Sequence, residues 1–149
     1  MTDKKKDPGV LLGRTSRLAG KIVVRRFQEE NIPLTLEQFG MLKMLSGDEH
    51  LIQQELADTF KKHKSAVLRL VDVLEQAGLV TKNCDESDRR KKTLEVTAKG
   101  KALIERAVTI SNEVISNLQE GLSAQEVEIF EKVSLHMQER ALEQITQPD

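Results

Sequence analysis

The feature that most constrains the fold is a change of hydrophobic period, from 3.6 residues to 2, at Gly78. Before it, apolar residues recur at i, i+3, i+4, i+7 and i+10 from Val67, which predicts an amphipathic helix over residues 64–77. Gly78 stands where a C′ glycine ends a helix. After it, the short β-branched segments 79–83 and 93–97 predict the two strands of a hairpin. We expect one face of this hairpin to carry Leu79, Thr81, Leu94 and Val96.

A second short helix is expected directly before this unit. Apolar residues share one face over residues 52–60, and a short turn at 61–63 joins them to the longer helix. Two such helices form a helix-turn-helix pattern. Because the polar segment 84–92 makes a long charged tip for the hairpin that follows, the whole unit reads as a winged helix. The predicted fold is therefore mainly α with a small β-hairpin wing.

Helices are also expected on both sides of the winged helix. Capping boxes at Thr35 with Gln38 and at Ser123 with Glu126 open two of them, and apolar stripes predict two more over residues 10–29 and 98–120. One small chain has few places to bury these stripes. We therefore expect a two-fold homodimer, in which residues 1–34 and 101–149 are dimerisation helices and residues 35–100 are the winged helix-turn-helix that binds DNA.

Composition excludes several functional classes. Aromatic residues make up 3 % of the 149 residues, which argues against a stacking platform for single-stranded nucleic acid. A single Cys excludes a disulfide framework within the chain and a four-Cys zinc site. His50, His63 and His136 form no recognisable metal spacing with Cys84, and no motif suggests catalysis. We expect a cytoplasmic, non-enzymatic protein with no membrane span, no metal and no cofactor.

The net charge of −1 hides an uneven distribution. Residues 61–92 carry nine Lys and Arg against five Asp and Glu, a net charge of +4, whereas residues 1–60 are neutral and residues 93–149 carry −5. Attraction to phosphate is set locally, within about one Debye length. A basic middle segment is therefore typical of a DNA-reading element, although a solvated charged loop has the same composition.

Four separated motifs carry a family resemblance. They are Ala-Val-Leu-Arg at 66–69, Leu-Glu-Gln-Ala-Gly-Leu-Val at 74–80, Asp-Arg-Arg at 88–90 and Thr-Ala-Lys-Gly at 97–100. In order and spacing they resemble the multiple-antibiotic-resistance regulator (MarR) family of bacterial winged-helix transcription factors. The resemblance covers nearly the whole chain. It implies a homodimeric regulator, most often a repressor, that binds a pseudo-palindromic duplex and responds to a small effector.

The helix over residues 64–77 is the candidate recognition helix. The first turns of such a helix enter the major groove and meet the base edges. The candidate DNA-binding residues there are His63, Lys64, Ser65, Ala66, Leu68 and Arg69. Arg69 suits a bidentate contact to guanine, and Leu68, which departs from the small polar residue frequent in the family, suits a thymine methyl group or has no role. Lys61, Lys62 and Lys64 suit phosphate contacts.

The hairpin tip supplies the candidate wing residues, which are Asp88, Arg89, Arg90, Lys91 and Lys92. The resemblance implies that the Asp pairs with one Arg and that another Arg enters the minor groove. A narrow minor groove attracts inserted Arg side chains. We assign Arg89 to the groove and Arg90 to the pair, with the two Lys residues near phosphates, although sequence alone does not separate the two arginines.

The regulatory input is the least constrained part. The resemblance implies an anionic aromatic effector bound where the dimer helices meet the winged helix, and the cationic row Arg14, Arg17 and Lys21 is the candidate lining. A solvated helix face is the alternative for this row. Two other functions remain open: a thiol redox response through Cys84, whose pKa neighbouring cations would lower, and a protein-interaction module without DNA binding.

Overall fold

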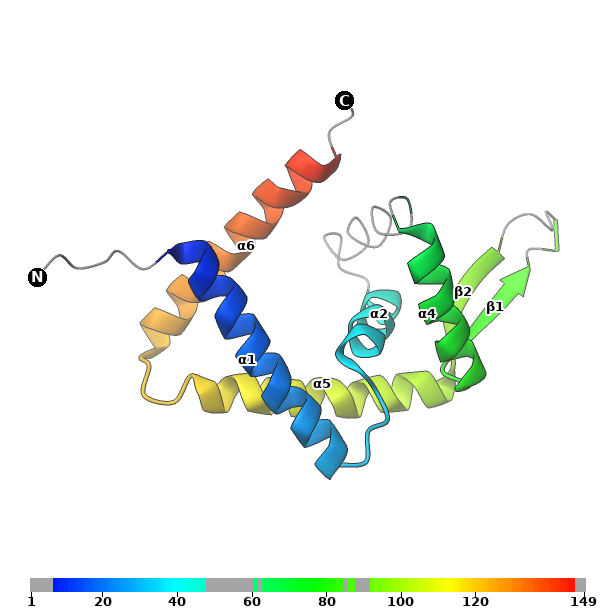
Figure 1. Cartoon of the computed structure of the whole chain (residues 1–149), viewed down its shortest axis with the longest axis horizontal. Coiled ribbons are helices and arrows are strands. Elements are labelled where there is room, and N and C mark those ends of the chain that lie inside the picture. The colour runs from blue at the N-terminus through cyan, green and yellow to red at the C-terminus, as the bar shows by residue number, and fades with distance from the viewer. Residues whose placement is uncertain (1–6, 48–60, 62, 85, 88–91, 147–149) are drawn as a thin grey trace, which may run out of the picture.

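The computed structural model describes residues 7–47, 61, 63–84, 86–87 and 92–146. Five helices and one two-stranded antiparallel sheet make up this part, so the predicted class, mainly α with a small hairpin, is confirmed. With the labels of Figure 1, the elements are α1 (Pro8–Glu29), α2 (Leu36–Ser46), α4 (Lys64–Gln76), β1 (Val80–Cys84), β2 (Lys92–Val96), α5 (Ala98–Leu118) and α6 (Ala124–Thr146). The helix predicted over residues 52–60 lies outside the described residues.

Helix α5 is the long central helix of the molecule (Figure 1). Helix α1 crosses it, α4 and the hairpin lie at its N-terminal end, and α6 turns back from its C-terminal end (Figure 1). One hydrophobic cluster joins α1, α2, α4, β1 and α5, with Phe27, Leu42, Val71 and Ala107 almost fully buried. The rings of Phe27 and Phe39 meet edge to face with centroids 5.3 Å apart, which fixes α1 against α2.

The helix ends follow the local signals of the sequence. Both predicted capping boxes are present: Gln38 N–H donates to Thr35 Oγ1 at 3.1 Å, and Glu126 N–H donates to Ser123 Oγ at 3.2 Å. Helix α1 begins two residues earlier than expected, because the Asp7 side chain accepts from Gly9 N–H at 2.8 Å and Pro8 suits the first helical position. Gly78 has φ of 73°, as a C′ glycine requires.

The face predicted for the hairpin is wrong at its first strand. The register pairs Val80 with Val96 and Lys82 with Leu94, so these four side chains share a face, whereas Thr81 is exposed and opposite Glu95. The reason is that Leu79 precedes the strand and is buried through the turn after α4, and alternation begins only at Val80. Because Leu79 and Val80 are buried in succession, the side chains that share a face with Val96 and Leu94 are those of Val80 and Lys82, one position later than predicted.

Candidate nucleic-acid interface

Helix α4 presents an apolar side to the core and a polar side to solvent. Val67, Val71 and Leu74 are at most 3 % exposed. Ser65 and Arg69 are exposed and Leu68 is 42 % exposed, whereas Leu70 is partly buried against the core. Residues three and four apart lie on the same side of a helix, so the buried residues share one side of α4 and the exposed residues share another. The start of α4 is thus an outward-facing surface on a helix that the core holds rigidly.

Six of the predicted DNA-binding residues share one open hollow at the start of α4. Its volume is about 390 Å³, and it is lined by Lys61, His63, Lys64, Ser65, Ala66 and Arg69. Arg69 lies back along its own helix, with Nε donating to the Ser65 carbonyl oxygen at 3.4 Å. His63 is the N-cap residue but contributes no capping hydrogen bond from its side chain, so the helix opens without a side-chain cap from that residue. Lysine charges, a guanidinium and a helix N-terminus together favour an anionic partner.

The structure describes the wing in its two strands and at residues 86–87 between them. Asp88, Arg89, Arg90 and Lys91 lie outside the described residues, as does Lys62, and the roles predicted for them stay predictions. The side chain of Lys92 is likewise not described, although its backbone begins β2 opposite Cys84. The side chain of Cys84 is also outside the description, so the redox alternative stays a prediction.

A lysine that sequence reasoning left without a role ties the wing to the recognition helix. Lys82 points from β1 to α4, where its Nζ donates to Asp72 Oδ1 and lies 3.8 Å from Glu75 Oε1. The hydrogen bond to Asp72 is the main cause that raises the pKa of Lys82. The sequence does place Asp72 and Glu75 at i and i+3 on one side of α4. Only the register of the strands, however, brings the Lys82 side chain to face them.

The Thr-Ala-Lys-Gly motif closes the other end of α4 onto α5. Thr97 Oγ1 accepts from Gly100 N–H at 3.0 Å and donates to the Gly78 carbonyl oxygen at 2.7 Å. Lys99 Nζ donates to the Ala77 carbonyl oxygen at 2.9 Å. A Cβ at Gly100 would lie 2.2 Å from the Leu79 carbonyl oxygen, so only glycine lets α5 approach this closely. The motif therefore fixes the C-terminal end of α4 against the start of α5.

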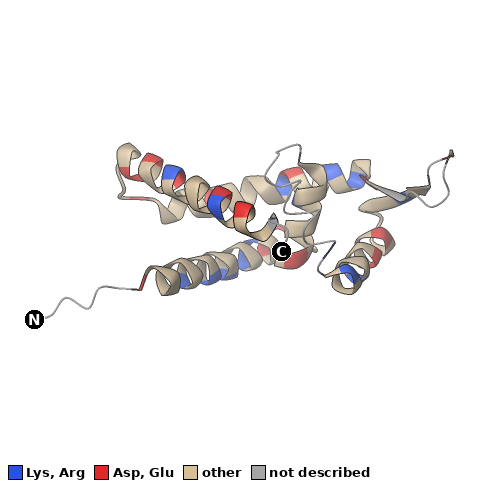
Figure 2. Cartoon of the chain, turned by 90° about the horizontal axis from the view of Figure 1, so that it is seen from above, with Lys and Arg blue, Asp and Glu red and all other residues tan. Residues whose placement is uncertain are grey.

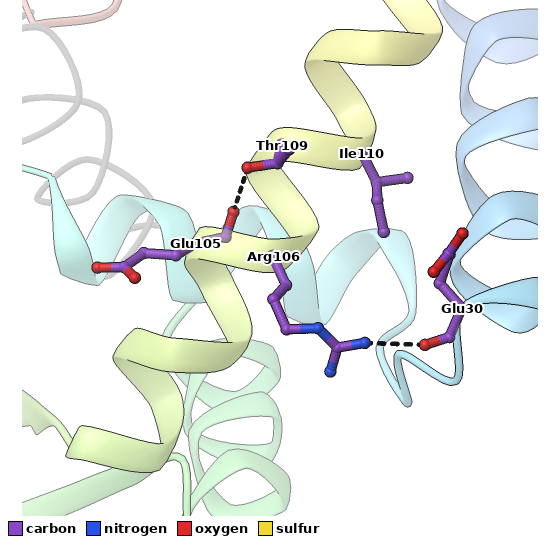
Figure 3. Close-up of a pocket in the computed structure, with 5 residues that line it drawn as sticks. All are labelled: Glu30, Glu105, Arg106, Thr109 and Ile110. Carbon is purple, nitrogen blue, oxygen red and sulfur yellow. Dashed lines mark hydrogen bonds between the residues drawn. The ribbon is translucent and has the colours of Figure 1, made fainter.

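A second hollow, of about 330 Å³, lies between the end of α1 and α5. In Figure 3, Arg106 reaches across it and its Nη2 donates to the Glu30 carbonyl oxygen at 2.9 Å. Glu105, Thr109 and Ile110 complete the lining. Two carboxylates and a guanidinium already engaged in a hydrogen bond do not favour an anionic ligand.

The candidate effector row does not line this second hollow. Arg14, Arg17 and Lys21 are exposed on α1, on the side away from the buried Val23 and Phe27. Among the described residues, no group of three or more His, Cys, Asp or Glu side chains is placed to hold a metal ion. No helix in the described ranges is both long enough and apolar enough to cross a membrane.

Comparisons with known proteins agree with this geometry. The profile of the MarR family matches residues 32–91. The transcriptional regulator HosA of Escherichia coli O157:H7 is 27 % identical over 105 residues, which are 70 % of this chain and 78 % of HosA. The crystal structure of CouR from Rhodococcus jostii RHA1 bound to p-coumaroyl-CoA superposes with a TM-score of 0.72 at 24 % identity, covering 93 % of this chain and 96 % of CouR.

The crystal structure of the S. aureus MepR–DNA complex superposes with a TM-score of 0.70 at 22 % identity, covering 89 % of this chain and 97 % of MepR. This likeness shows a shared fold over 89 % of the chain. The profile match spans three of the four sequence motifs, those at 66–69, 74–80 and 88–90. The chain is therefore similar to transcriptional regulators of the MarR family, over residues 32–91 in the profile match and over 70 % of its length in HosA.

Proposed function

We propose that the protein regulates transcription by binding double-stranded DNA with the N-terminal half of α4 in the major groove. The observation that carries this proposal is the open hollow lined by Lys61, His63, Lys64, Ser65, Ala66 and Arg69. Arg69 specifies a guanine, and Leu68 contacts a thymine methyl group. Lys61, Lys62 and Lys64 bind phosphates, which position the helix without specifying sequence. The S. aureus MepR–DNA complex supports the choice of duplex DNA as the partner.

The wing adds a second contact in the minor groove. Arg89 enters the groove, Arg90 pairs with Asp88, and Lys91 and Lys92 bind flanking phosphates. In support of this arrangement, Lys82 joins β1 to Asp72 and Glu75 of α4. A wing tied to the recognition helix moves with it, so the two elements read the duplex as one unit.

The functional unit is a homodimer on a pseudo-palindromic operator. Among the side chains of α6 that the structure describes, none is buried, and Phe130, Val133 and Met137 are each more than half exposed. A helix with this much uncovered apolar surface needs a partner to be stable in water. Two-fold symmetry then sets two copies of α4 about 34 Å apart, one turn of B-form DNA.

An effector releases the operator, which makes the protein a cytoplasmic repressor. We assign the effector to the class of small anionic aromatic compounds, and the p-coumaroyl-CoA bound to CouR belongs to that class. Coupling of about 1–3 kcal/mol between the effector and DNA sites is sufficient to shift operator occupancy. The exposed row Arg14, Arg17 and Lys21 becomes part of an enclosed site only if another element covers it.

The test compares Arg69→Ala and Arg89→Ala with the parent on operator and on random duplex. Arg69→Ala should weaken operator binding by about 1–3 kcal/mol and relax the base preference at one position. Arg89→Ala should weaken binding through the wing. Lys43→Ala, which removes an exposed cation from α2, is the control and should leave operator binding unchanged. Parent-like affinity of both Arg variants for both duplexes would refute the assignment, as would parent binding that does not fall with salt.

A further inference from the structure

Helices α1 and α6 carry rows of opposite charge with the same spacing. On α1, Arg14, Arg17, Lys21 and Arg25 stand at i, i+3, i+7 and i+11. On α6, Glu128, Glu131 and Glu139 stand at i, i+3 and i+11, with Lys132 at i+4 and Leu135 at i+7, so three carboxylates and one ammonium group give this side a net negative charge. Residues at these spacings share one side of a helix. Each row therefore spans about 16 Å, at 1.5 Å per residue. We call them the cationic row and the acidic row.

Neither row has its charges matched by ion pairs with other helices in the part of the chain that the structure describes. Among the described residues, Arg14, Arg17 and Lys21 form no ion pair, and Glu128, Glu131 and Glu139 form none either. Arg25 has only the exposed Glu29 of its own helix, 3.9 Å away. Between Pro8 and Gln28, α1 contains no acidic residue, so its cations also repel one another.

The two helices do not cover each other in the single chain. They overlap in Figure 1, but the view in Figure 2 separates them, with basic positions along α1 and acidic positions at several turns of α6. Both rows border apolar surface, since Leu18 beside the cationic row is 48 % exposed and Leu135 within the acidic row is 53 % exposed. Each row is therefore the rim of an uncovered apolar strip.

The exposed apolar surface is concentrated on the same helices. Of the sixteen large hydrophobic residues recorded as exposed in the described ranges, thirteen lie in the N-terminal half of α1 or between residues 115 and 145. Only Leu36, Leu68 and Val73 lie elsewhere. A surface with an apolar centre and a charged rim is typical of a protein interface. The partner of the cationic row must present acidic side chains at the same spacing.

We infer that the cationic row of one copy faces the acidic row of a second copy, and that two-fold symmetry repeats this contact. The inference rests on the homodimer proposed above. It adds that the two charged rows select the partner helix and set its register. The apolar strips supply the association energy, while the charges at the rim steer the two helices and disfavour other pairings. The cationic row is thus covered by the partner's α6, which takes the place that an anionic ligand would otherwise occupy.

The experiment uses the full-length chain with one row reversed at a time. Variant R14E/R17E/K21E places two acidic rows in contact, and variant E128K/E131K/E139K places two cationic rows in contact. Each alone should raise the dimer dissociation constant by on the order of 100-fold, measured by sedimentation equilibrium. An equimolar mixture of the two, carrying different tags, should form the heterodimer because both contacts are then complementary. The chain with both rows reversed should dimerise as the parent does.

Controls and contrary outcomes keep this inference separate from the proposed function. Variant E37K/E86K/E95K changes the net charge as much as reversal of the acidic row does, at exposed sites outside both rows, and should leave dimerisation unchanged. A parent chain that sediments only as a monomer would overturn the homodimer and the inference together. Reversed variants that dimerise as tightly as the parent would overturn the inference and leave the homodimer standing. If a singly reversed chain does not fold alone, co-expression with its complement should rescue it, and failure of that rescue contradicts the pairing.

An anionic effector is the rival occupant of the cationic row. If it binds there alone, R14E/R17E/K21E abolishes the response to salicylate, used as a simple anionic aromatic probe, while the dimer dissociation constant stays at the parent value. That result would overturn the charge pairing. Raised salt distinguishes the two further, because it should weaken a dimer steered by rim charges and strengthen one held by apolar contact alone.

Discussion

The region where α4, the hairpin and α5 meet, which we call the corner, differs sharply from α6. At the corner, polar groups are hydrogen-bonded and apolar side chains are buried, whereas many apolar side chains of α6 are exposed. At the corner, Thr97 and Lys99 donate to the carbonyl oxygens of Gly78 and Ala77, directly after α4. Leu74, Leu79 and Val80 are at most 3 % exposed. Helix α6 has its own capping box but no buried residue among its described side chains. The corner is completed within one chain, whereas α6 would be covered only in the homodimer that we propose.

The difference separates two tasks of a DNA-binding regulator. The reading surface must hold a fixed geometry, and hydrogen bonds across elements together with close packing provide that rigidity. The dimerising surface must stay free to meet a second chain, so its apolar side chains remain on the outside of the single chain. Changes at the corner should therefore alter the stability of each chain, and changes on α6 should alter association.

The largest effect is expected at Gly100. Gly100→Ala would place a methyl group 2.2 Å from the Leu79 carbonyl oxygen and 2.8 Å from Val96 Cγ1, so backbone must move. We expect a loss of about 3 kcal/mol in the free energy of unfolding, measured by urea denaturation at fixed protein concentration. Gly40→Ala on α2 is the control, because an added Cβ there meets open space outside both rows and a helical alanine gains about 1 kcal/mol over glycine. Equal effects of the two substitutions would contradict the close packing of the corner.

Phe130 tests the other side of the comparison. It is 55 % exposed on α6, yet Phe130→Ala should weaken the dimer by about 2 kcal/mol, because large aromatic residues dominate interfaces. Val73→Ala on α4 truncates a residue of similar exposure, 47 %, and should change association by less than about 0.5 kcal/mol. Sedimentation equilibrium measures both. A Phe130→Ala chain that associates like the parent would show that this part of α6 is simply solvated.

The contrast between the two regions was only partly predictable from sequence. The period of α4 correctly placed Val67, Val71 and Leu74 in the core, and capping signals located the starts of α2 and α6, because both depend on residues within one or two turns. The hairpin face was not predictable, since the turn after Gly78 buries Leu79 before the strand alternation begins. The pairing of Lys82 with Asp72 depends on that same register, and so no local pattern could reveal it.

For the candidate site, sequence predicted the outward side of α4 but not the grouping of its residues. Lys61 and His63 precede the helix, and only the turn geometry brings them into one hollow with Arg69. Leu68 projects outside that hollow, which its place in the motif did not indicate. Long-range packing decides such groupings, and a single sequence carries no direct record of it.

The N-cap residues Thr97 of α5 and Ser123 of α6 provide a smaller test of the comparison between the corner and α6. Thr97→Ala removes the cap of α5 and also the hydrogen bond to the Gly78 carbonyl oxygen, so it should cost about 2 kcal/mol of unfolding free energy. Ser123→Ala removes only the cap of α6 and should cost about 1 kcal/mol. Urea denaturation measures both, and Thr97→Ser, which keeps the hydroxyl, is the control. A larger loss at Ser123 would mean that α6 is coupled to the rest of the fold more tightly than α5 is.

The smallest effect is a pH dependence of opposite sign in the two regions. The hydrogen bond to Asp72 raises the pKa of Lys82 above its ordinary value of 10.5, so the stabilisation from this pair is present below that value and is lost as the pH rises through the raised pKa. Hydrogen bonds from the Ser123 amide, and secondly from its hydroxyl, lower the pKa of Glu126 below its ordinary value of 4.5. That contribution is present above 4.5 and is lost as the pH falls through the lowered pKa.

Thermal denaturation of the parent, Lys82→Met and Glu126→Gln against pH separates these two contributions. The parent and Lys82→Met should differ in Tm at neutral pH and converge only in strong alkali, because methionine keeps the side-chain length without the charge. The parent and Glu126→Gln should converge in acid, because glutamine preserves the capping box and removes only the titration. Since the corner belongs to the packed core and α6 does not, the alkaline convergence should follow the loss of tertiary structure, whereas the acid convergence should accompany fraying at the start of α6 alone. Convergence of both variants on the same side of neutrality would contradict the assigned pairs.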